Sequence, residues 1–220
     1  MEPGGRSISP LNIPGWRSFP LQARLSAATG LQVQIDNDAK ALALGEGWLG
    51  AAQNSSSYLA MVVSTGIGGG IVLDGRLLDG RTGNAGHLGH LVVVEGGRLC
   101  RCGVRGCLEA EASGTAIAEI SGRPASEAGG EIITRTAFLV GKAVASVVAL
   151  LDLDLCVVAG SVALGFGERF FDEAQRSMDE HLGLEYTRGA RIIPAGLGGE
   201  GPLVGAAAVG LFGSGILVDR

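Results

Sequence analysis

The sequence predicts an α/β fold, and three observations carry this prediction. The composition, 46% hydrophobic and 18% charged over 220 residues, is sufficient for a substantial core. Short apolar runs bounded by turn residues indicate buried strands. In the second half of the chain these runs alternate with longer segments of helical spacing, after a start that is richer in strands.

Helices are expected where apolar residues recur at helical spacing. These segments are residues 21–30, 39–52, 107–118, 131–151, 166–181 and 202–212. An Asx residue just before Ala39 is well placed as the N-cap of the second helix. The segment 131–151 carries little charge on its inner face, so we expect it to be largely buried.

Strands are expected in the short apolar or alternating runs. These are residues 31–35, 58–64, 70–73, 91–94, 155–159 and 191–194. The run 31–35 (LQVQI) alternates and ends in Asp36-Asn37-Asp38. A glycine-rich stretch separates 58–64 from 70–73, and this pattern predicts a hairpin.

Charge and terminal composition exclude several classes of protein. The net charge is −5 without a long basic run, so a nucleic-acid footprint is missing. Residues 1–16 lack the charged-then-apolar pattern of a signal peptide. The uncharged stretch 47–73 is interrupted by polar residues and glycines, so no membrane helix is expected there. We therefore expect a cytoplasmic protein that binds neither membrane nor nucleic acid.

Three cysteines and a histidine have the spacing of a zinc site. Cys100, Cys102 and Cys107 offer thiolates, and His90 lies ten residues upstream of the first. This Cys3His set suits tetrahedral structural zinc with no position left open for water. Cys100 and Cys102 are too close for an unstrained mutual disulfide, and disulfides rarely persist in the cytoplasm. The alternative is a loop of reduced cysteines without a ligand.

The remaining histidine and cysteine near this pattern have separate interpretations. His87 precedes His90 by three residues and competes with it as a ligand, because a helix or turn places both on one face. Spacing leaves that choice open. Cys156 lies in an apolar strand and is expected to pack as a small hydrophobe.

Three motifs together resemble a known family. They are STGIGGG at residues 64–70, GNAGHLGH at 83–90 and CRCGVRGCLE at 100–109. Their order and distances resemble those of the ROK family (repressor, open reading frame, kinase), and the resemblance extends from about residue 12 to near the C-terminus. It implies sugar kinases or sugar-responsive repressors with an actin-like, ribonuclease-H-like ATPase fold.

The resemblance assigns catalytic and sugar-binding roles to particular positions. Asp38 matches the general base that takes a proton from the sugar hydroxyl as it attacks the γ-phosphate of ATP. Without the resemblance, Asp38 is more simply a helix cap. The positions that match sugar-binding residues are Asn12, Asn37, His90 and Glu109.

His90 therefore has two implied roles, one toward zinc and one toward the sugar. One ring nitrogen would bind zinc while the other meets a hydroxyl, so the structural metal would fix the ring orientation. His87 stands where the family usually has a glutamate that accepts sugar hydroxyl bonds. A neutral imidazole still accepts such a bond, so sugar preference changes or the variant is simply tolerated.

The resemblance also implies a nucleotide site. Thr65, Gly66, Gly68 and Gly69 match the family's second phosphate loop, where backbone N–H groups and a hydroxyl meet phosphate oxygens. Gly160 and Ser161 follow a strand at the place of the family's nucleotide-binding Gly-Gly. Mg²⁺ is expected to accompany ATP.

One family motif has no counterpart in this sequence. The family opens with an Asp-x-Gly-x-Thr turn that positions ATP phosphates and Mg²⁺, and this turn does not occur here. Two actin-like lobes need about 150 residues each. We therefore expect a complete C-terminal lobe at residues 53–220, preceded by the tail of an N-terminal lobe at 1–52 with an unprotected strand edge.

Three explanations of that pattern stay open. The chain is a shortened or incompletely predicted gene product, a degenerate kinase that keeps its zinc and sugar contacts, or the sensor part of a repressor. The first implies a ROK-type kinase that transfers phosphate from ATP to a hexose or amino-hexose. The others imply a non-catalytic sugar binder or regulator. In each case a homodimer is expected from the family.

Overall fold

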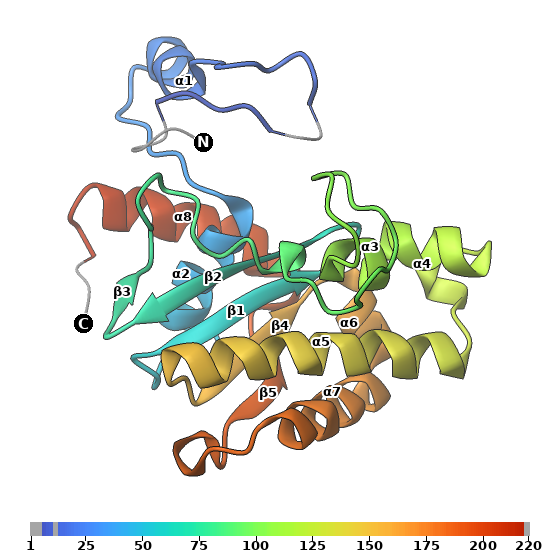
Figure 1. The fold of residues 1–220 in the computed structure, drawn as a ribbon. Helices are drawn as coiled ribbons and strands as arrows, with labels where there is room; N and C mark the ends of the chain where they lie inside the picture. Colours follow the sequence, from blue (N-terminus) through green and yellow to red (C-terminus); the bar gives the residue numbers. More distant parts are fainter. Residues whose placement is uncertain (1–5, 11–12, 218–220) are drawn as a thin grey trace.

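A computed structural model describes residues 6–10 and 13–217, and its central element is a mixed sheet of five strands (Figure 1). The spatial order of the strands is β3-β2-β1-β4-β5. Their bounds are β1 Tyr58–Val63, β2 Ile67–Leu73, β3 Arg76–Leu77, β4 Leu155–Ala159 and β5 Arg191–Pro194. The α/β prediction is therefore confirmed.

The sheet changes from antiparallel to parallel at β1. On one side, β1 pairs antiparallel with β2, with Tyr58 opposite Val72 and Val63 opposite Ile67. On its other side, β1 pairs parallel with β4, which in turn pairs parallel with β5. Strands buried on both faces are expected to be apolar throughout, and this is why β1 and β4 lack polar alternation.

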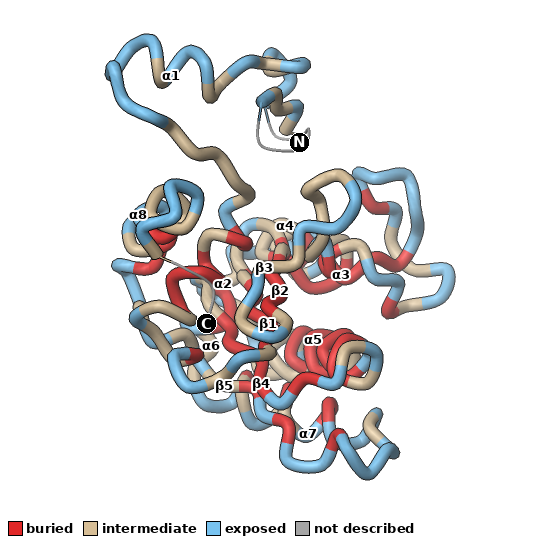
Figure 2. Tube along the Cα trace, turned by 90° about the vertical axis from the view of Figure 1, so that its left-hand side faces the viewer, coloured by how far each residue is buried: buried red, intermediate tan, exposed pale blue. Residues whose placement is uncertain are grey.

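Helices cover both faces of the sheet, so the molecule has three layers (Figure 2). One face carries α5 (Gly130–Leu151) and α7 (Glu168–His181), which pack with Leu59 and Met61 of β1. The opposite face carries α2 (Asp38–Leu49), whose residues pack with Tyr58 and Ala60. α8 (Gly201–Gly213) lies against α2. Alternate residues of β1 thus serve two separate cores.

The remaining helices are short. They are α1 Leu21–Thr29, α3 Leu108–Ala112, α4 Gly114–Ser121 and α6 Ser161–Phe166, with 3-10 turns at η2 Leu88–His90, η3 Ala125–Glu127, η4 Glu185–Thr187 and η5 Gly198–Glu200. The segment around α1 lies outside the three layers (Figure 1), and α1 has no buried residue. Its local contacts include a stacked pair, Trp16 and Phe19, with ring centroids 4.5 Å apart.

Two of the predicted strands do not form in the structure. Residues 31–35 have no regular secondary structure, and Leu31 is 69% exposed, because no described strand lies beside them to complete a ladder. Residues 91–94 form an isolated bridge between Val92 and Cys107 instead of a strand. Residues 31–35 alternate and residues 91–94 form an apolar run, but strand formation also depends on a partner strand.

Two further predictions were wrong in detail. Three of the four glycines of the STGIGGG motif, residues 68–70, lie inside β2 and pair with β1, so the turn of the hairpin is shorter than predicted. The helix expected at 107–118 breaks at Ser113, whose hydroxyl accepts a hydrogen bond from the Ala116 N–H at 3.1 Å and caps α4. A side chain that competes for backbone N–H groups favours a new helix start there.

By length and composition alone, α5 is the one helix in the described part of the chain that could cross a membrane. More than half of the relevant window is buried inside the protein. Val140 and Val144 of α5 are fully buried in the core that it shares with β1 and α7. Helix α5 is accordingly a core helix, and the prediction of a largely buried inner face is confirmed.

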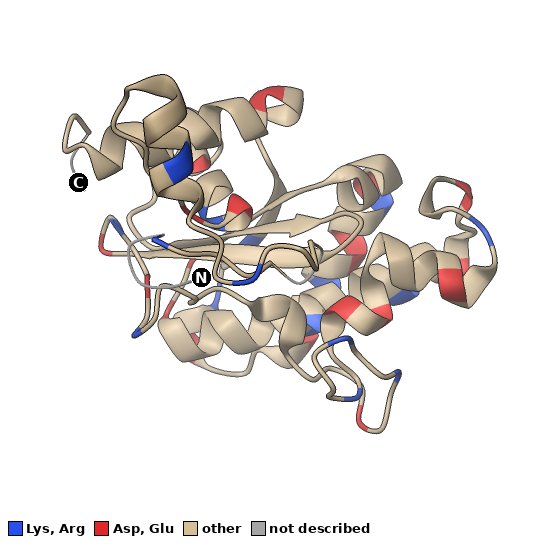
Figure 3. Ribbon diagram, turned by 90° about the horizontal axis from the view of Figure 1, so that it is seen from above, with Lys and Arg blue, Asp and Glu red and all other residues tan. Residues whose placement is uncertain are grey.

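Charged residues of both signs are interspersed along the ribbon in the view of Figure 3. Helix α8 differs, because its sequence GPLVGAAAVGLFG contains no charged residue. Its buried residues are small, namely Gly201, Gly205 and Ala208. Gly205 lies directly on α2, where an added Cβ would come within 2.7 Å of the Ala41 carbonyl oxygen. The two helices therefore pack at unusually short range.

A buried carboxylate fixes the C-terminal end of α2. Glu46 is 0% exposed, and its two oxygens accept hydrogen bonds from three backbone N–H groups. The donors are Ala51 at 2.7 Å, Gly196 at 3.0 Å and Leu197 at 3.1 Å. The last two belong to the connection between β5 and α8, so Glu46 joins segments that are 150 residues apart.

We predict that Glu46→Ala lowers the free energy of unfolding by about 2–5 kcal/mol, since three backbone N–H groups lose the fully buried side chain that accepts their hydrogen bonds. Denaturant unfolding measures this change. Glu185→Ala removes an exposed carboxylate and should stay within about 0.5 kcal/mol of the parent protein. Equal stability of the two variants would contradict the anchoring role.

Candidate active site and metal centre

The three cysteines and His90 converge on one point. One ligand atom from each residue lies within 4.8 Å of all the others. The Sγ of Cys100 is 3.6 Å from Nδ1 of His90, and the Sγ atoms of Cys102 and Cys107 are 3.6 Å apart. Ligands on a tetrahedral zinc, with bonds of about 2.0–2.3 Å, are about 3.6–3.8 Å from one another. The donor set and its spacing therefore fit Zn²⁺.

The backbone of this zinc knuckle (residues 100–107) is held by short-range hydrogen bonds. The N–H of Cys100 bonds to the Val104 carbonyl at 2.8 Å, and the N–H of Gly103 returns to the Cys100 carbonyl at 2.9 Å. Gly106 has a φ of 79° and lies on the Val94 carbonyl, where a Cβ would be at 1.7 Å. A residue with a side chain has no room at that position.

The thiols differ in their environments. Burial raises the pKa of Cys107 to about 12, whereas a hydrogen bond to the backbone of Val104 lowers the pKa of the exposed Cys102. Zinc binds thiolates, so binding would displace the Cys107 proton. Cys156 differs from both, because it is fully buried in β4 and burial alone raises its thiol pKa. Its prediction as a packed hydrophobe is confirmed.

The structure separates the two competing histidines. His90 belongs to the four-residue cluster, whereas His87 lies outside it, with ring centroids 6.1 Å apart. Partial burial lowers the pKa of His87, and the neighbouring His90 acts in the same direction. Glu109 and Asp38 act on it in the opposite direction, so both carboxylates lie within electrostatic range of this ring.

Asn37 rather than Asp38 caps α2. The Asn37 Oδ1 accepts hydrogen bonds from Ala39 N–H at 2.9 Å and Lys40 N–H at 3.4 Å. Asp38 is the first residue of the helix and is exposed, and its Oδ1 lies 2.8 Å from the Ala39 N–H. Because Asn37 supplies the cap, one Asp38 oxygen and its solvent-facing surface stay accessible to a ligand.

Glu109 connects the zinc knuckle with the turn after β1. It follows Cys107 by two residues and lies in the first turn of α3, and its Oε2 accepts a hydrogen bond from the Ile67 N–H at 3.0 Å. The turn itself is fixed from the other side by α4. The Gly114 N–H bonds to the Ser64 carbonyl at 2.7 Å, and the Thr115 hydroxyl bonds to the Thr65 carbonyl at 2.9 Å.

Gly160 and Ser161 lie beside the same turn. The hydroxyls of Ser161 and Ser64 are 2.9 Å apart, and Gly160 has a φ of 102° directly over the Val63 carbonyl. These two segments follow β4 and β1, which are neighbouring parallel strands. The carboxyl ends of such strands are where open α/β sheets bind ligands.

Gly68 and Gly69 have a packing role that the sequence did not reveal. Both lie in β2, where a Cβ at Gly68 would be 3.2 Å from the Ala39 Cβ and one at Gly69 only 1.9 Å from Leu88. Their small size lets α2 and η2 approach β2 from opposite faces. Contact with a phosphate stays a prediction for these two residues.

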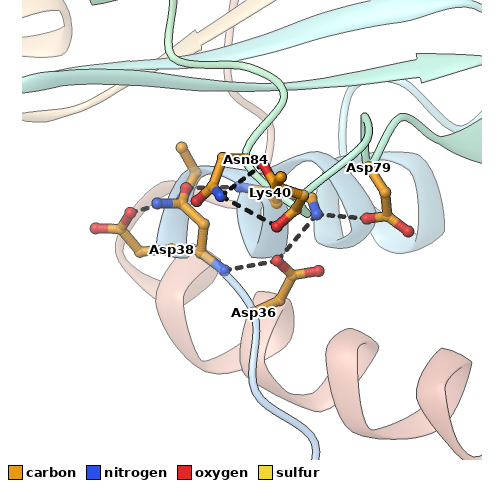
Figure 4. Close-up of polar contacts among 8 residues, drawn as sticks. Asp36, Asp38, Lys40, Asp79 and Asn84 are labelled. Atoms are coloured by element: carbon orange, nitrogen blue, oxygen red, sulfur yellow. Dashed lines mark hydrogen bonds and ion pairs between the residues drawn. The ribbon is translucent and has the colours of Figure 1, made fainter. Parts of the chain in front are cut away.

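Two buried charged residues near the site were missed by the sequence analysis. Glu111 is 2% exposed, accepts a hydrogen bond from the Arg98 N–H at 2.6 Å and pairs with Arg135 of α5 at 2.5 Å. It thereby holds the segment before the knuckle against the core. Lys40 is 1% exposed and pairs with two aspartates (Figure 4). Each interrupts an apolar helix face, which is the signal that could have shown them.

Four of the candidate residues line part of a small cavity of about 110 Å³, namely Thr65, Gly66, Cys100 and Glu109. A larger cavity of about 420 Å³ lies between α5 and α7 and includes Arg135, but it contains none of the candidate residues. The residue types that line the smaller cavity, rather than its volume, identify it as part of the candidate site. Asn12, the remaining predicted sugar contact, lies outside the described residues.

The sequence profile of the ROK family matches residues 3–211. The chain belongs to the ROK family. It is 50% identical over 106 residues to a glucokinase of Thermotoga maritima, covering 48% of this chain and 33% of that protein. It is 37% identical over 181 residues to an N-acetylmannosamine kinase of Yersinia pestis, covering 74% and 62%. The chain thus spans from a third to about three fifths of these relatives.

Solved structures agree with this family. The ROK hexokinase of Thermus thermophilus superposes with a TM-score of 0.83 at 38% identity, covering 94% of this chain and 74% of that one. A Streptomyces griseus ROK glucokinase solved with glucose and AMPPNP gives 0.82 at 31% identity, covering 94% and 77%. A ROK transcriptional regulator gives 0.78 at 27% identity, covering 90% and 57%. The fold is the actin-like ATPase fold of ROK sugar kinases.

We predict that Cys102→Ser lowers zinc content and stability together, because a structural zinc site contributes folding free energy. A loss of a few kcal/mol corresponds to a fall in Tm of about 5–10 °C for a chain of this length. Zinc analysis and thermal unfolding measure both quantities.

Cys156→Ala is the matched control, because its thiol lies in β4, away from the cluster. This variant should keep the zinc content of the parent protein. Full zinc retention in Cys102→Ser would overturn the four-ligand assignment.

Proposed function

We propose that this chain carries the sugar site of a ROK-type kinase that transfers the γ-phosphoryl group of Mg²⁺-ATP to a hexose or amino-hexose hydroxyl. One observation carries the proposal. The segments that carry Asp38, His90 and Glu109 all reach the first residues of β2, since Ala39 lies at Gly68, Leu88 lies at Gly69, and Glu109 accepts a hydrogen bond from the Ile67 N–H. The relatives named as glucokinase and N-acetylmannosamine kinase support the same chemistry.

Asp38 is the proposed general base. Its accessible oxygen accepts the proton of the attacking hydroxyl, the hydroxyl oxygen bonds to the γ-phosphorus, and the bond to the bridging oxygen breaks to release ADP. Because phosphoryl transfer needs little covalent help from the protein, the contribution of this site is the orientation of the hydroxyl. Asn37 precedes Asp38 and caps the helix through its side-chain oxygen, which fixes the backbone that carries Asp38.

His90 and Glu109 are the proposed sugar contacts. In this proposal zinc is structural, supplying charge that stabilises three thiolates and holds the His90 ring. Since Nδ1 of His90 faces Cys100, Nε2 is the nitrogen on the far side of the ring, available to a hydroxyl. His87 stands beside them as a further hydrogen-bonding group and is the proposed source of a changed sugar preference.

Thr65, Gly66, Gly160 and Ser161 are the proposed phosphate contacts. Thr65 and Ser161 are exposed, and the turn that carries Thr65 is fixed by α4. Backbone N–H groups and hydroxyls at the carboxyl ends of two parallel strands suit phosphate oxygens. Gly68 and Gly69 would act less directly, by letting β2 support this turn.

A non-catalytic, sugar-responsive regulator is the second candidate. The superposition on a ROK transcriptional regulator favours it. The two candidates differ in a measurable way. Hexose binding with ADP release indicates the kinase, and hexose binding without ADP release indicates the regulator.

Three further expectations accompany the proposal. We expect a cytoplasmic location, a homodimer and a functional division near residue 52. The division has a structural complication, because α2 precedes that boundary and yet packs on β2 and α8, which follow it. A boundary at residue 52 would therefore cut through a shared core.

We predict that Asp38→Asn lowers hexose-dependent ADP formation by about 10²–10⁴-fold, as expected for loss of a general base, with zinc content unchanged. Assays with glucose and N-acetylmannosamine test both sugar classes. Asp172→Asn, which alters an exposed carboxylate on α7, is the control and should leave the rate unchanged. Undiminished turnover, or loss of zinc, in Asp38→Asn would show that the residue is misplaced.

A further inference from the structure

A buried ammonium group lies beside the proposed catalytic base. The Lys40 side chain is only 2% exposed, and its Nζ contacts the Asp79 carboxylate at 2.5 Å and the Asp36 carboxylate at 3.1 Å. Figure 4 shows the three side chains meeting at the start of α2, with Asp38 on the adjoining turn. The two aspartates come from segments that are far apart in the sequence.

Because Lys40 is buried, its ion pairs with Asp36 and Asp79 strongly influence the conformation around the start of α2. An ammonium group taken out of water is unfavourable by several kcal/mol unless carboxylates and hydrogen bonds compensate it. Asp36 is 17% exposed and lies four residues before Lys40, whereas Asp79 is 70% exposed and follows β3. Without Asp79, the buried Lys40 ammonium group would keep Asp36 as its single carboxylate partner among those described. The conformation that brings Asp79 to Lys40 is therefore favoured.

The first contact fixes the backbone that precedes the catalytic base. The Asp36 oxygen that meets Lys40 also accepts a hydrogen bond from the Asn37 N–H at 2.8 Å. Asn37 then caps α2 through its own side chain. The backbone that carries Asp38 is therefore fixed by hydrogen bonds on both sides of this residue.

The second contact fixes the loop that leads to the histidines. The Asp79 carbonyl accepts a hydrogen bond from the Ala85 N–H at 3.0 Å and closes residues 79–85 into a loop. Within this loop Asn84 donates to the Thr82 carbonyl at 3.0 Å. Gly86 follows and lies on β2, where a Cβ would be 2.2 Å from the Gly69 carbonyl. His87 comes next.

We propose that Lys40 is a positioning residue for the proposed phosphoryl transfer. Its ammonium group joins Asp36, at the base of the Asp38 segment, to Asp79, at the base of the histidine segment. It thereby sets the distance between the carboxylate that takes the proton and the imidazoles that hold the sugar. This inference rests on the proposed function, but its structural part is measurable without catalysis.

Three variants of the full chain test the inference. Asp79→Asn removes one partner while leaving Lys40 paired with Asp36, and Lys40→Met removes the joining charge itself. Asp74→Asn is the matched control, because it alters an exposed carboxylate in the β2–β3 turn whose φ of 50° asparagine also tolerates. Hydrogen exchange by mass spectrometry and steady-state kinetics are measured on each zinc-loaded variant.

The inference predicts faster exchange in residues 79–90 of Asp79→Asn and Lys40→Met, with β4 exchange and zinc content unchanged. It also predicts that kcat falls by up to about 10²-fold, as for a misplaced reacting group, while KM for ATP stays the same. Asp74→Asn should match the parent protein in every readout. A purely stabilising role would instead raise exchange throughout the sheet and leave kcat unchanged.

Parent-like exchange of residues 79–90 in both variants would overturn the inference, as would faster exchange with an unchanged kcat. Absence of hexose-dependent transfer in the parent chain contradicts the proposed function instead. Exchange in the two variants then decides by itself whether Lys40 joins the segments. The two failures are thus distinguishable.

Discussion

The candidate site depends on the close approach of two segments to the glycines of β2. A Cβ at Gly70 would come within 2.8 Å of the Ala39 carbonyl and the Ala43 Cβ, so this glycine admits α2 on one face. Gly69 faces the opposite way and admits Leu88 of η2. Because successive residues of a strand point to opposite faces, one short run of glycines brings both the Asp38 segment and the histidine segment onto the same strand.

The Cys3His cluster and the buried charges then stabilise the segments around this strand, whose close approach the glycines permit. Glu109 bonds to the first residue of β2, and Glu111, on the same short helix, pairs with Arg135 of α5. A four-ligand zinc would brace the loop ahead of that helix, since residues 99–105 are mostly exposed and bury little apolar surface. The site thus combines a loop held by the ion pair of the buried Glu111 and by a cluster of candidate zinc ligands with a sheet held by close packing.

Sequence reasoning succeeded where local pattern and burial agree. The strands at 155–159 and 191–194 and the long helix α5 were predicted within a residue, and the four candidate zinc ligands lie close together, as their spacing predicted. It failed for residues 31–35, because alternation does not supply a partner strand. Lys40 and Glu111 each interrupt an apolar helix face, but that signal does not identify their partners Asp79 and Arg135, which lie 39 and 24 residues away in the chain. The packing role of Gly68 and Gly69 was missed because close packing leaves no separate mark in the sequence, and their contact with a phosphate stays a prediction.

The central claim is that a zinc-held histidine and the Asp38 helix form one hexose site. Calorimetric titration of glucose and of N-acetylmannosamine into zinc-loaded and zinc-stripped protein tests it most directly, with circular dichroism reporting the fold of each form. The account predicts saturable binding of at least one of these sugars to the zinc-loaded form, and much weaker binding after zinc removal even where the sheet persists. Equal affinity in the two forms, or no binding of either sugar to the zinc-loaded form, would contradict it.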